Sequence, residues 1–290
     1  MELARAKKCK IAVAQAQEPE VIEAVKEAHA TGAADFILVG DRDKIKNLIA
    51  LDKFEVIHES EPQAACEQAI KLVNSGRAQA LMKGLVDTSV IMKAVLAKDS
   101  GIRDRAKMLS HIAAFELNTY HKLLFVTDAA INIMPDLEAK KQILKNSVEA
   151  LNRLGIAKPK VALLAAKEKV DPKMPATLDY EKIIQDHKQG FLLDNAIIDG
   201  PFALDNAISK HSCNIKGIDS PVGADADLLL CPDIEAGNIL YKALVFFASA
   251  KTGGVVLGAK HPVILTSRAD SKETKIFSIA LSSLFGTVSS

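Results

Sequence analysis

Three stretches of this 290-residue chain place hydroxyl, amide or cationic side chains where an apolar strand gives way to a helix. In residues 263–277, an apolar run ends at Leu265, then Ser267 and Arg268 precede a helical pattern. A connection that only had to turn would more often use Gly, Asn or Pro. A guanidinium is a bidentate donor for phosphate or carboxylate, and open α/β sheets bind ligands at the carboxyl ends of their strands. The pair therefore predicts an anion site. The alternative is that Ser267 caps the following turn, with Asp270 three residues on, beside a solvated arginine.

The second stretch, residues 81–96, ends a strand at Lys83 and begins a helix at Thr88 and Ser89. A helix N-terminus presents free N–H groups and the positive end of the helix dipole, which together suit a phosphate. The two hydroxyl groups add further donors. The alternative is that Asp87 or Thr88 simply caps the helix. We interpret Lys83, Thr88 and Ser89 as substrate-binding residues.

The third stretch, residues 231–244, has Gly237 and Asn238 at the opening of an otherwise apolar helix. Both residue types lower helix stability, so this position indicates a need for a polar side chain and a close backbone approach. The alternative is an ordinary loop followed by an imperfect helix start. We expect Asn238 to bind substrate.

The elements that must position these residues alternate between strand and helix. Continuous apolar strands separated by helices indicate a parallel sheet that is covered on both faces. About ten strands approach the limit of one open twisted sheet, so we expect two α/β lobes, residues 1–120 plus 262–290 and residues 121–261, with the active site in the cleft between them. Strands are predicted at residues 10–14, 35–40, 54–58, 78–84, 122–129, 160–166, 195–201 and 226–233, and the glycine-rich range 251–267 is predicted to carry one or two more.

Composition excludes several classes of function. A net charge of +1 gives no bulk attraction to nucleic acid or to an anionic membrane, and no apolar run is long enough to span a bilayer. No dinucleotide-binding glycine pattern, P-loop, nucleophile elbow or H-E-x-x-H motif is present, and the seven histidines are scattered, so no metal site is expected. The four cysteines form no C-x-x-C pair. A cytoplasmic protein with free thiols is the expectation.

Four segments in the same order resemble the phosphate acetyl/butyryl transferase family over nearly the whole chain. They read "GLVDTSVIMKAVL", "LLFVTDAAINIMPDLEAKKQIL", "PDIEAGNILYKAL" and "PVILTSRADSKETK". The chain length and the form "TSRADS" resemble the butyryl-transferring members more than the acetyl-transferring ones. The resemblance implies a two-lobed α/β/α fold similar to isocitrate and isopropylmalate dehydrogenases, and a homodimer.

The same resemblance implies a reaction. An acyl group, butyryl or branched and short, would pass from acyl-CoA to inorganic phosphate by direct attack in a ternary complex. Both compounds are substrates, so no cofactor is expected, and a butyrate or acetate kinase is the expected pathway neighbour. Ser267 and Arg268 would be the catalytic residues. One departure concerns the general base, because Thr274 stands where the acetyl-transferring members have an aspartate.

Three other functions stay open from the sequence. The chain could be a phosphate acetyltransferase, a metal- or NAD-dependent dehydrogenase on the same fold, or a non-catalytic acyl-CoA-binding protein. A metal-dependent dehydrogenase would need a set of carboxylates for the ion.

A covalent acyl-enzyme is a further alternative, because Cys213 lies two residues after His211 in a polar segment between two predicted strands. On an extended segment such residues point the same way, and a Cys–His pair can form an acyl-enzyme. No obvious thiolate stabiliser lies nearby, and phosphate is itself an adequate nucleophile. We therefore predict that Cys213 is not a nucleophile.

Overall fold

The protein forms two compact units, described here from a computed structural model. Unit 1 comprises Met1–Lys107 and Thr252–Ser290, and unit 2 comprises Met108–Lys251. Both boundaries fall earlier in the chain than the sequence-based lobes, because the strand at Ser110–Glu116 pairs with the next strand of unit 2 and the strand at Lys251–Leu257 pairs within unit 1. The structure describes residues 2–5, 9–98, 102–104, 106–266 and 270–286.

The described strands of unit 1 lie in the order β3-β2-β1-β4-β11-β10. Neighbouring pairs are parallel, except that β10 and β11 are antiparallel. The predicted α/β class is therefore confirmed for this unit, with one antiparallel addition. The strands are β1 (Lys10–Ala14), β2 (Asp35–Gly40), β3 (Glu55–His58), β4 (Ala80–Lys83), β10 (Lys251–Leu257) and β11 (Val263–Ile264).

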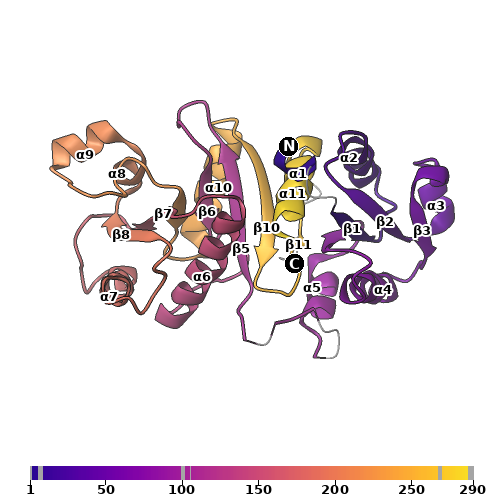
Figure 1. Cartoon of the computed structure of the whole chain (residues 1–290), viewed down its shortest axis with the longest axis horizontal. Helices are drawn as coiled ribbons and strands as arrows, with labels where there is room; N and C mark the ends of the chain where they lie inside the picture. The colour runs from indigo at the N-terminus through magenta and orange to yellow at the C-terminus, as the bar shows by residue number, and fades with distance from the viewer. Residues whose placement is uncertain (1, 6–8, 99–101, 105, 267–269, 287–290) are drawn as a thin grey trace. The chain divides into compact units, whose positions relative to one another are not determined.

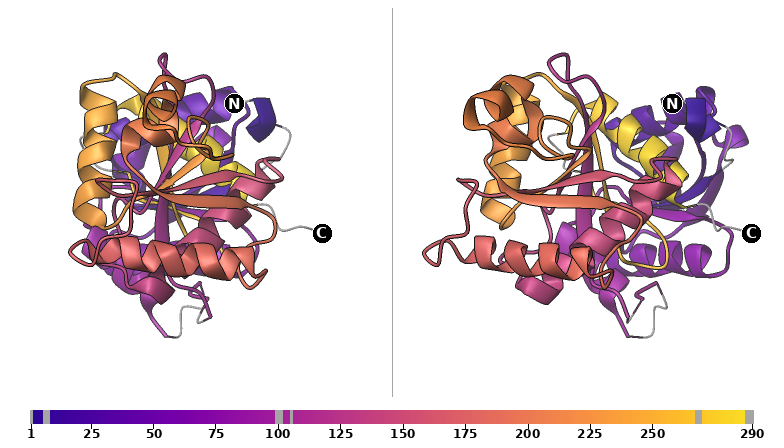
Figure 2. Two further views of the ribbon diagram at one scale, coloured as in Figure 1. Left: turned by 90° about the vertical axis from the view of Figure 1, so that its left-hand side faces the viewer. Right: turned by 60° about the vertical axis from the view of Figure 1, so that its left-hand side comes forward.

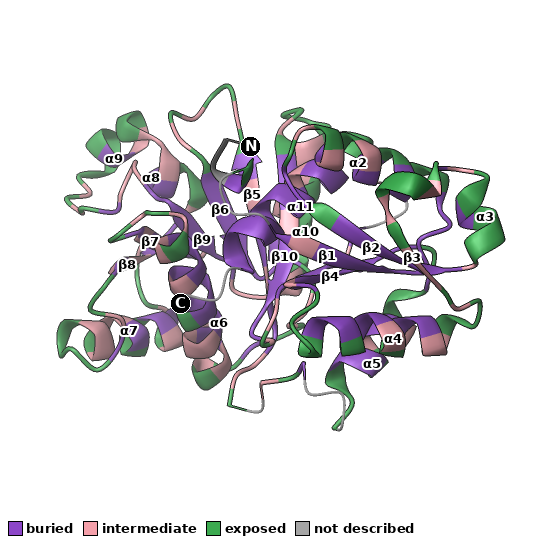
Figure 3. Cartoon of the chain, turned by 45° about the vertical axis from the view of Figure 1, so that its right-hand side comes forward, coloured by how far each residue is buried: buried purple, intermediate pink, exposed green. Residues whose placement is uncertain are grey.

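Helices cover both faces of the unit 1 strands. Helix α2 (Pro19–Ala30) packs beside α11 (Lys272–Phe285) on one face, and α4 (Pro62–Asn74) packs beside α5 (Thr88–Leu96) on the other (Figures 1 and 3). The strands between these layers are mostly buried (Figure 3). Short elements complete the unit: α1 (Glu2–Arg5), α3 (Arg42–Lys46) and η1 (Leu51–Lys53).

The described strands of unit 2 lie in the order β5-β6-β9-β7-β8. Pairing is parallel from β6 through β8, and β5 is antiparallel to β6. Strand β5 lies between the strands predicted at residues 78–84 and 122–129. The strands are β5 (Ser110–Glu116), β6 (Leu124–Thr127), β7 (Lys160–Leu164), β8 (Ile197–Phe202) and β9 (Leu228–Leu230).

Unit 2 also has helices on both faces of its strands. Helices α6 (Leu137–Arg153) and α7 (Pro175–Lys188) lie together on one side, and α8 (Leu204–Ile208) lies on the other (Figures 1 and 2). One side of α10 (Ile234–Phe246), with Leu240 and Leu244, packs on the hydrophobic core of unit 2. Helix α9 (Lys210–Lys216) follows α8. Among the described helices, none is both long and apolar enough to cross a membrane.

Candidate functional site

The carboxyl ends of three parallel strands meet at one edge of unit 1. Strand β4 lies between β1 and β11, and the register pairs Ala14 with Lys83 and Ile264 with Met82. From β1 the chain continues to β2 on one side, whereas β4 lies on the other side, so the carboxyl ends of β1 and β4 form a topological switch point. Such a point is where open α/β sheets bind ligands. The β4–α5 junction and the segment after β11 therefore start from neighbouring strand ends.

A glycine fastens the β4–α5 junction to the end of β1. The Gly84 N–H donates to the Ala14 carbonyl over 2.8 Å, and the Leu85 N–H donates to the Gln15 carbonyl over 2.7 Å. A Cβ atom at Gly84 would lie 2.2 Å from the Gln15 carbonyl oxygen. Only glycine allows this close approach. The contact fixes the position of the loop that leads into α5 relative to the end of β1.

Gln15 is a buried polar residue at this edge that the sequence analysis missed. It has a φ of 55°, and its side-chain amide donates to the carbonyls of Glu59 and Ser60, each over 3.3 Å. Its carbonyl oxygen in turn holds the β4–α5 loop. A signal was present in the sequence, since Gln15 directly follows the apolar run 10–14 at a strand end.

Lys83 is buried, and its ammonium group lies within the loop that it precedes. The Nζ atom donates to the carbonyls of Val86 over 3.2 Å and Gly84 over 3.4 Å. These contacts place a positive charge just before the start of α5. They also give Lys83 a part in shaping the loop.

The start of α5 is exposed and has no side-chain cap. Asp87 occupies the N-cap position, but its side chain makes no capping hydrogen bond. Thr88 and Ser89, the first two helical residues, are exposed. The side chain of Asp87 therefore does not cap α5, as one alternative from the sequence would have it.

The two predicted catalytic residues, Ser267 and Arg268, lie outside the described residues. Before them, Thr266 is buried. After them, Ser271 caps α11 by accepting a hydrogen bond from the Thr274 N–H over 3.1 Å. The N-cap of helix α11 is thus Ser271.

Two residues next to this segment have structural roles. The Thr274 hydroxyl lies 3.2 Å from the Ser271 hydroxyl and belongs to the α11 cap. The ammonium group of Lys275, which is fully buried, donates to the Asp270 carbonyl over 2.6 Å. Both interactions fix the chain where it leaves the Ser267–Arg268 segment.

In unit 2 the residues Gly237 and Asn238 hold α10 against the turn after β6. A Cβ atom at Gly237 would lie 2.2 Å from the Asp128 carbonyl oxygen. The Asn238 amide donates to the Ala129 carbonyl over 3.2 Å. The close backbone approach expected from the sequence is present, but the partner is this turn. Asn238 is itself exposed.

Asp128 organises the same turn from inside. One carboxylate oxygen accepts hydrogen bonds from the N–H groups of Ala130 and Ile131, each over 2.9 Å. The other accepts from the Asn132 amide over 2.6 Å and from the His111 N–H over 3.1 Å. The buried Asp128 carboxylate is therefore fully used within unit 2, and it was also missed from the sequence.

Cys213 lies in helix α9 and not in an extended segment, which corrects the geometry expected from the sequence. Residues two apart on a helix do not face one another, so His211 and Cys213 do not form a pair along the chain. The Cys213 thiol is buried and donates to the Asn206 carbonyl over 3.0 Å. Burial, together with the Asp205 carboxylate, raises the pKa of this thiol. A thiol with a raised pKa is a poor nucleophile.

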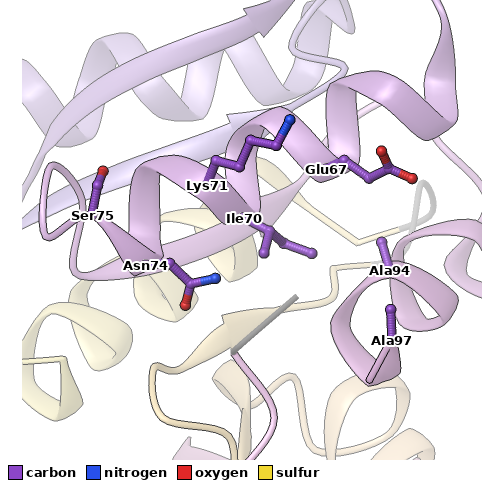
Figure 4. Close-up of a pocket in the computed structure, with 7 residues that line it drawn as sticks. All are labelled: Glu67, Ile70, Lys71, Asn74, Ser75, Ala94 and Ala97. Atoms are coloured by element: carbon purple, nitrogen blue, oxygen red, sulfur yellow. The ribbon is translucent and has the colours of Figure 1, made fainter. Parts of the chain in front are cut away.

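A pocket of about 560 Å³ lies between α4 and α5 (Figure 4). It is at the C-terminal end of α5, whereas Thr88 and Ser89 begin that helix. The pocket is thus separate from the strand edge described above. Its lining residues are Glu67, Ile70, Lys71, Asn74, Ser75, Ala94 and Ala97. Among the described residues, no group of three or more His, Cys, Asp or Glu side chains could hold a metal ion.

Comparison with protein families gives a match over residues 53–283 to the model described as phosphate acetyl/butaryl transferase. The chain belongs to this family. A phosphate butyryltransferase of Clostridium acetobutylicum is 44% identical over 95% of this chain and 92% of that protein. A probable phosphate butyryltransferase of Bacillus subtilis is 46% identical over 93% of this chain and 91% of that protein. The resemblance inferred from the sequence is confirmed.

Solved structures support the same assignment. The branched-chain phosphotransacylase of Enterococcus faecalis superposes with a TM-score of 0.86 at 34% identity, covering 95% of this chain and 99% of that one. The 4-hydroxythreonine-4-phosphate dehydrogenase of Klebsiella pneumoniae has a TM-score of 0.60 at 12% identity, covering 97% of this chain and 100% of that one, which shows the fold alone. The predicted dehydrogenase-like fold class is confirmed.

Proposed function

We propose that this protein transfers a butyryl or short branched acyl group from acyl-CoA to inorganic phosphate. A phosphate oxygen attacks the thioester carbonyl carbon, the C–S bond breaks, and the products are an acyl phosphate and free CoA. Membership of the family and the similarity to phosphate butyryltransferases and a branched-chain phosphotransacylase support this reaction.

One observation carries the proposal. The parallel ends of β4 and β11 are neighbours, so the exposed start of α5 and the chain that follows β11 as far as Thr266 leave the same edge of unit 1. Thr88, Ser89 and Lys83 then supply hydroxyl donors and a positive charge for phosphate, and Arg268 supplies a bidentate clamp. A helix N-terminus without a side-chain cap retains N–H groups for an anion.

The reaction requires that phosphate be positioned and its negative charge be neutralised, more than it requires an acid catalyst. A thiol pKa of about 8.5 makes CoA an acceptable leaving group, and phosphate is partly dianionic at neutral pH. We assign Ser267 to the developing oxyanion or the leaving sulfur. For Asn238, whose amide nitrogen is bonded to Ala129, we retain a substrate contact only through its amide oxygen.

The acyl group moves directly between the two substrates in this proposal. Cys213 is buried, lies on a different face of α9 from His211, and has a raised thiol pKa, all of which oppose an acyl-enzyme.

We further propose that the enzyme is a cytoplasmic homodimer and that a butyrate or acetate kinase consumes its product. The four free, buried cysteines are consistent with a reducing compartment.

Release of free thiol from a panel of acyl-CoAs, with and without phosphate, tests the reaction. We expect phosphate-dependent release that is faster with butyryl-CoA or a branched four- or five-carbon acyl-CoA than with acetyl-CoA. One methylene changes discrimination by about 1–3 kcal/mol. A clear preference for acetyl-CoA would identify a phosphate acetyltransferase instead. Binding of acyl-CoA without any release would identify a binding protein.

Two Arg268 variants test the phosphate clamp. We expect Arg268→Ala to lose most activity and raise the KM for phosphate. We expect Arg268→Lys to recover only part, because a point charge does not replace the guanidinium fork. Near-normal kcat/KM in a folded Arg268→Ala variant would remove Arg268 from the site.

A rise in the melting temperature of the protein on addition of NAD or Mg²⁺ would instead favour the dehydrogenase alternative.

A further inference from the structure

A pocket in unit 2, which we call the α8–α10 pocket, lies where helices α8 and α10 pack over the strands. Its volume is about 440 Å³. Leu124 of β6 and Leu229 of β9 line it from the sheet, and both are buried. Sites for small molecules have volumes of about 300–1,000 Å³, so the α8–α10 pocket is large enough for an organic ligand.

The α8–α10 pocket is separate from the residues assigned to acyl transfer. Its lining includes Leu124, the first residue of β6, and Leu244 in the last turn of α10. Both lie toward the amino ends of the parallel strands. Asn238 and the turn after β6, by contrast, lie at the opposite ends of these two elements. The acyl transfer proposed above therefore gives this pocket no role.

The helical side chains around the α8–α10 pocket are apolar and incompletely packed. Leu204 and Ile208 line it from α8, and Leu240 and Leu244 line it from α10. Leu204 is 37% exposed, and the other three are only partly buried although they pack against the unit 2 core. An apolar side chain that faces a hollow lacks the van der Waals contacts that neighbouring atoms would supply. An apolar ligand would restore those contacts.

The lining from α10 follows the length of the helix. Leu240, Leu244 and Ala248 recur every four residues, so they lie on one side of the chain. Ala248 lies just beyond the last helical residue. Two helical turns measure roughly 11 Å, a length that suits an extended alkyl chain better than a compact ring.

One cation and no carboxylate line the α8–α10 pocket. The cation is the exposed Lys210, which forms no ion pair with any residue that the structure describes. Thr119 and Ser209 add two hydroxyl groups. The Tyr120 hydroxyl already donates to the Ala226 carbonyl over 2.8 Å, so Tyr120 contributes mainly its ring. The charge at this pocket is therefore complementary to an anion.

We propose that the α8–α10 pocket binds a straight-chain carboxylate of medium length, with its hydrocarbon chain among the leucines of α8 and α10 and its carboxylate at Lys210. The apolar lining selects an alkyl chain, and the lone cation selects a negative head group over a positive one. Butyrate would leave most of a pocket of about 440 Å³ empty, so a longer chain is required. This binding site goes beyond the proposed acyl transfer and does not depend on it.

Isothermal titration calorimetry of the full chain with butyrate, hexanoate and octanoate tests the chemical class. Each methylene that enters the pocket should tighten binding about fourfold, so octanoate should bind much more tightly than butyrate. An affinity that does not rise with chain length, or no binding of octanoate, would overturn the proposal. Turnover of acyl-CoA is not measured, so the outcome is independent of the proposed reaction.

Comparison of octanoate with 1-octanol tests the head group. Lys210→Met should weaken the binding of octanoate by about fivefold, as for an exposed ion pair, and leave the binding of 1-octanol unchanged. Lys182→Met is the control, because Lys182 is also exposed but lies on α7. Equal effects of Lys210→Met on the two ligands, or an equal loss of octanoate binding in Lys182→Met, would remove the carboxylate from Lys210.

A single tryptophan locates the ligand, because the chain has none of its own. An octanoate that carries bromine at the far end of its chain should quench the fluorescence of Leu204→Trp as it binds. Phe191→Trp, at a residue that is 77% exposed and outside the pocket, should not be quenched at the same concentration. Loss of octanoate binding in a folded Leu204→Trp variant would also place the ligand here, since the indole would fill the pocket. Binding that is retained without quenching, or equal quenching of both variants, would place the ligand elsewhere and overturn the proposal.

Discussion

Two strand-to-helix junctions have nearly the same sequence signature and very different structures. Both β4–α5 and β9–α10 join an apolar strand to an apolar helix with an aspartate at the N-cap, and each has a nearby glycine: Gly84 in the first connection, and Gly237 in the first turn of α10. At α10, the Asp233 carboxylate caps the Ala236 N–H over 2.8 Å, and Gly237 seats the helix against the turn after β6. At α5, the N-cap side chain makes no capping bond and the next two hydroxyl residues are exposed.

The difference separates polar residues that build the protein from polar residues that remain available to a ligand. Hydrogen-bonding groups that already have partners inside the protein stabilise it, and binding a ligand would require breaking those bonds. At the β9–α10 junction, Asp233 and Asn238 already have hydrogen-bond partners within the protein. At the β4–α5 junction Thr88 and Ser89 remain exposed, and this junction lies next to the carboxyl end of β11.

Alanine at the two glycines should have the largest effect. Gly84→Ala and Gly237→Ala both place a Cβ atom 2.2 Å from a backbone oxygen, so we expect each to lower the free energy of unfolding by about 2–4 kcal/mol. Gly76→Ala is the control: its φ is +75° but nothing lies within 4 Å, so a loss of about 1–2 kcal/mol is expected. Urea unfolding measures all three, and equal losses would contradict the close packing.

Hydroxyl removal at α5 should separate the β4–α5 junction from the β9–α10 junction. Thr88→Val with Ser89→Ala should raise the KM for phosphate by about tenfold or more, because hydrogen bonds to charged groups contribute about 1.5–3 kcal/mol. Asn238→Ala should mainly lower stability, by about 1 kcal/mol, with a smaller change in that KM. Steady-state kinetics measure the KM for phosphate, and urea unfolding measures the stability. A larger rise in that KM for Asn238→Ala than for the α5 variant would show that the β9–α10 junction, and not the β4–α5 junction, binds phosphate.

An ion cluster at the amino ends of the unit 2 strands gives a third effect, on stability alone. The side chains of His121, Lys122 and Lys160 contact the Asp225 carboxylate at 2.6–2.9 Å. Burial alone would raise the pKa of Asp225, but these hydrogen bonds outweigh it and hold that pKa well below its usual range. A depressed pKa means that the contribution is present above the unfolded-state pKa of about 3.9 and is lost as pH falls below it.

Asp225→Asn should therefore lower stability by about 1 kcal/mol at pH 7, a value reduced by solvent screening of this partly exposed group. The difference from wild type should shrink below about pH 4. Urea unfolding as a function of pH measures it, with the KM for phosphate as the control that should not change. A difference that persists undiminished at pH 3 would show that the charge is not responsible.

The smallest effect is expected at Cys213. Cys213→Ala should keep activity within about twofold, because the Cys213 thiol is buried, bonded to the Asn206 carbonyl and has a raised pKa, which makes it a poor nucleophile. Initial-rate plots at several fixed concentrations of the second substrate should intersect, as a ternary complex requires. Parallel plots, or an acyl adduct on Cys213 seen by mass spectrometry after mixing with acyl-CoA alone, would establish the covalent route.

Local signals in the sequence determined most of the secondary structure. Strands at 10–14 and 35–40 follow directly from continuous apolar runs, and α2 is delimited by Pro19 near its start and Gly32 after its end. Helix α6 likewise ends just before Gly155. These features are set by residues within a few positions of one another, so they are readable without coordinates. The family assignment was readable for the same reason, from four short segments in order.

Weak local signals explain what the sequence missed. Helix α7 buries only Thr177, Tyr180 and Ile183, so its apolar face is thin and it was not predicted. The short helix α9 is polar except for Cys213 and Ile215, so its sequence carries no helical apolar pattern and predicts an extended segment instead. In both cases packing against neighbouring elements stabilises the helix, and the local sequence pattern does not predict that packing.

Tertiary structure alone decided which polar residues are used and which are free. The pairing of Ile264 with Met82 joins strands from distant parts of the chain, and it brings the β4–α5 junction next to the end of β11. The same long-range packing gives Gly237 and Asn238 their partner in the turn after β6, and leaves the outer side of α10 exposed. A sequence specifies residue types, but whether a donor already has an acceptor depends on backbone atoms that only folding brings within 3 Å or so.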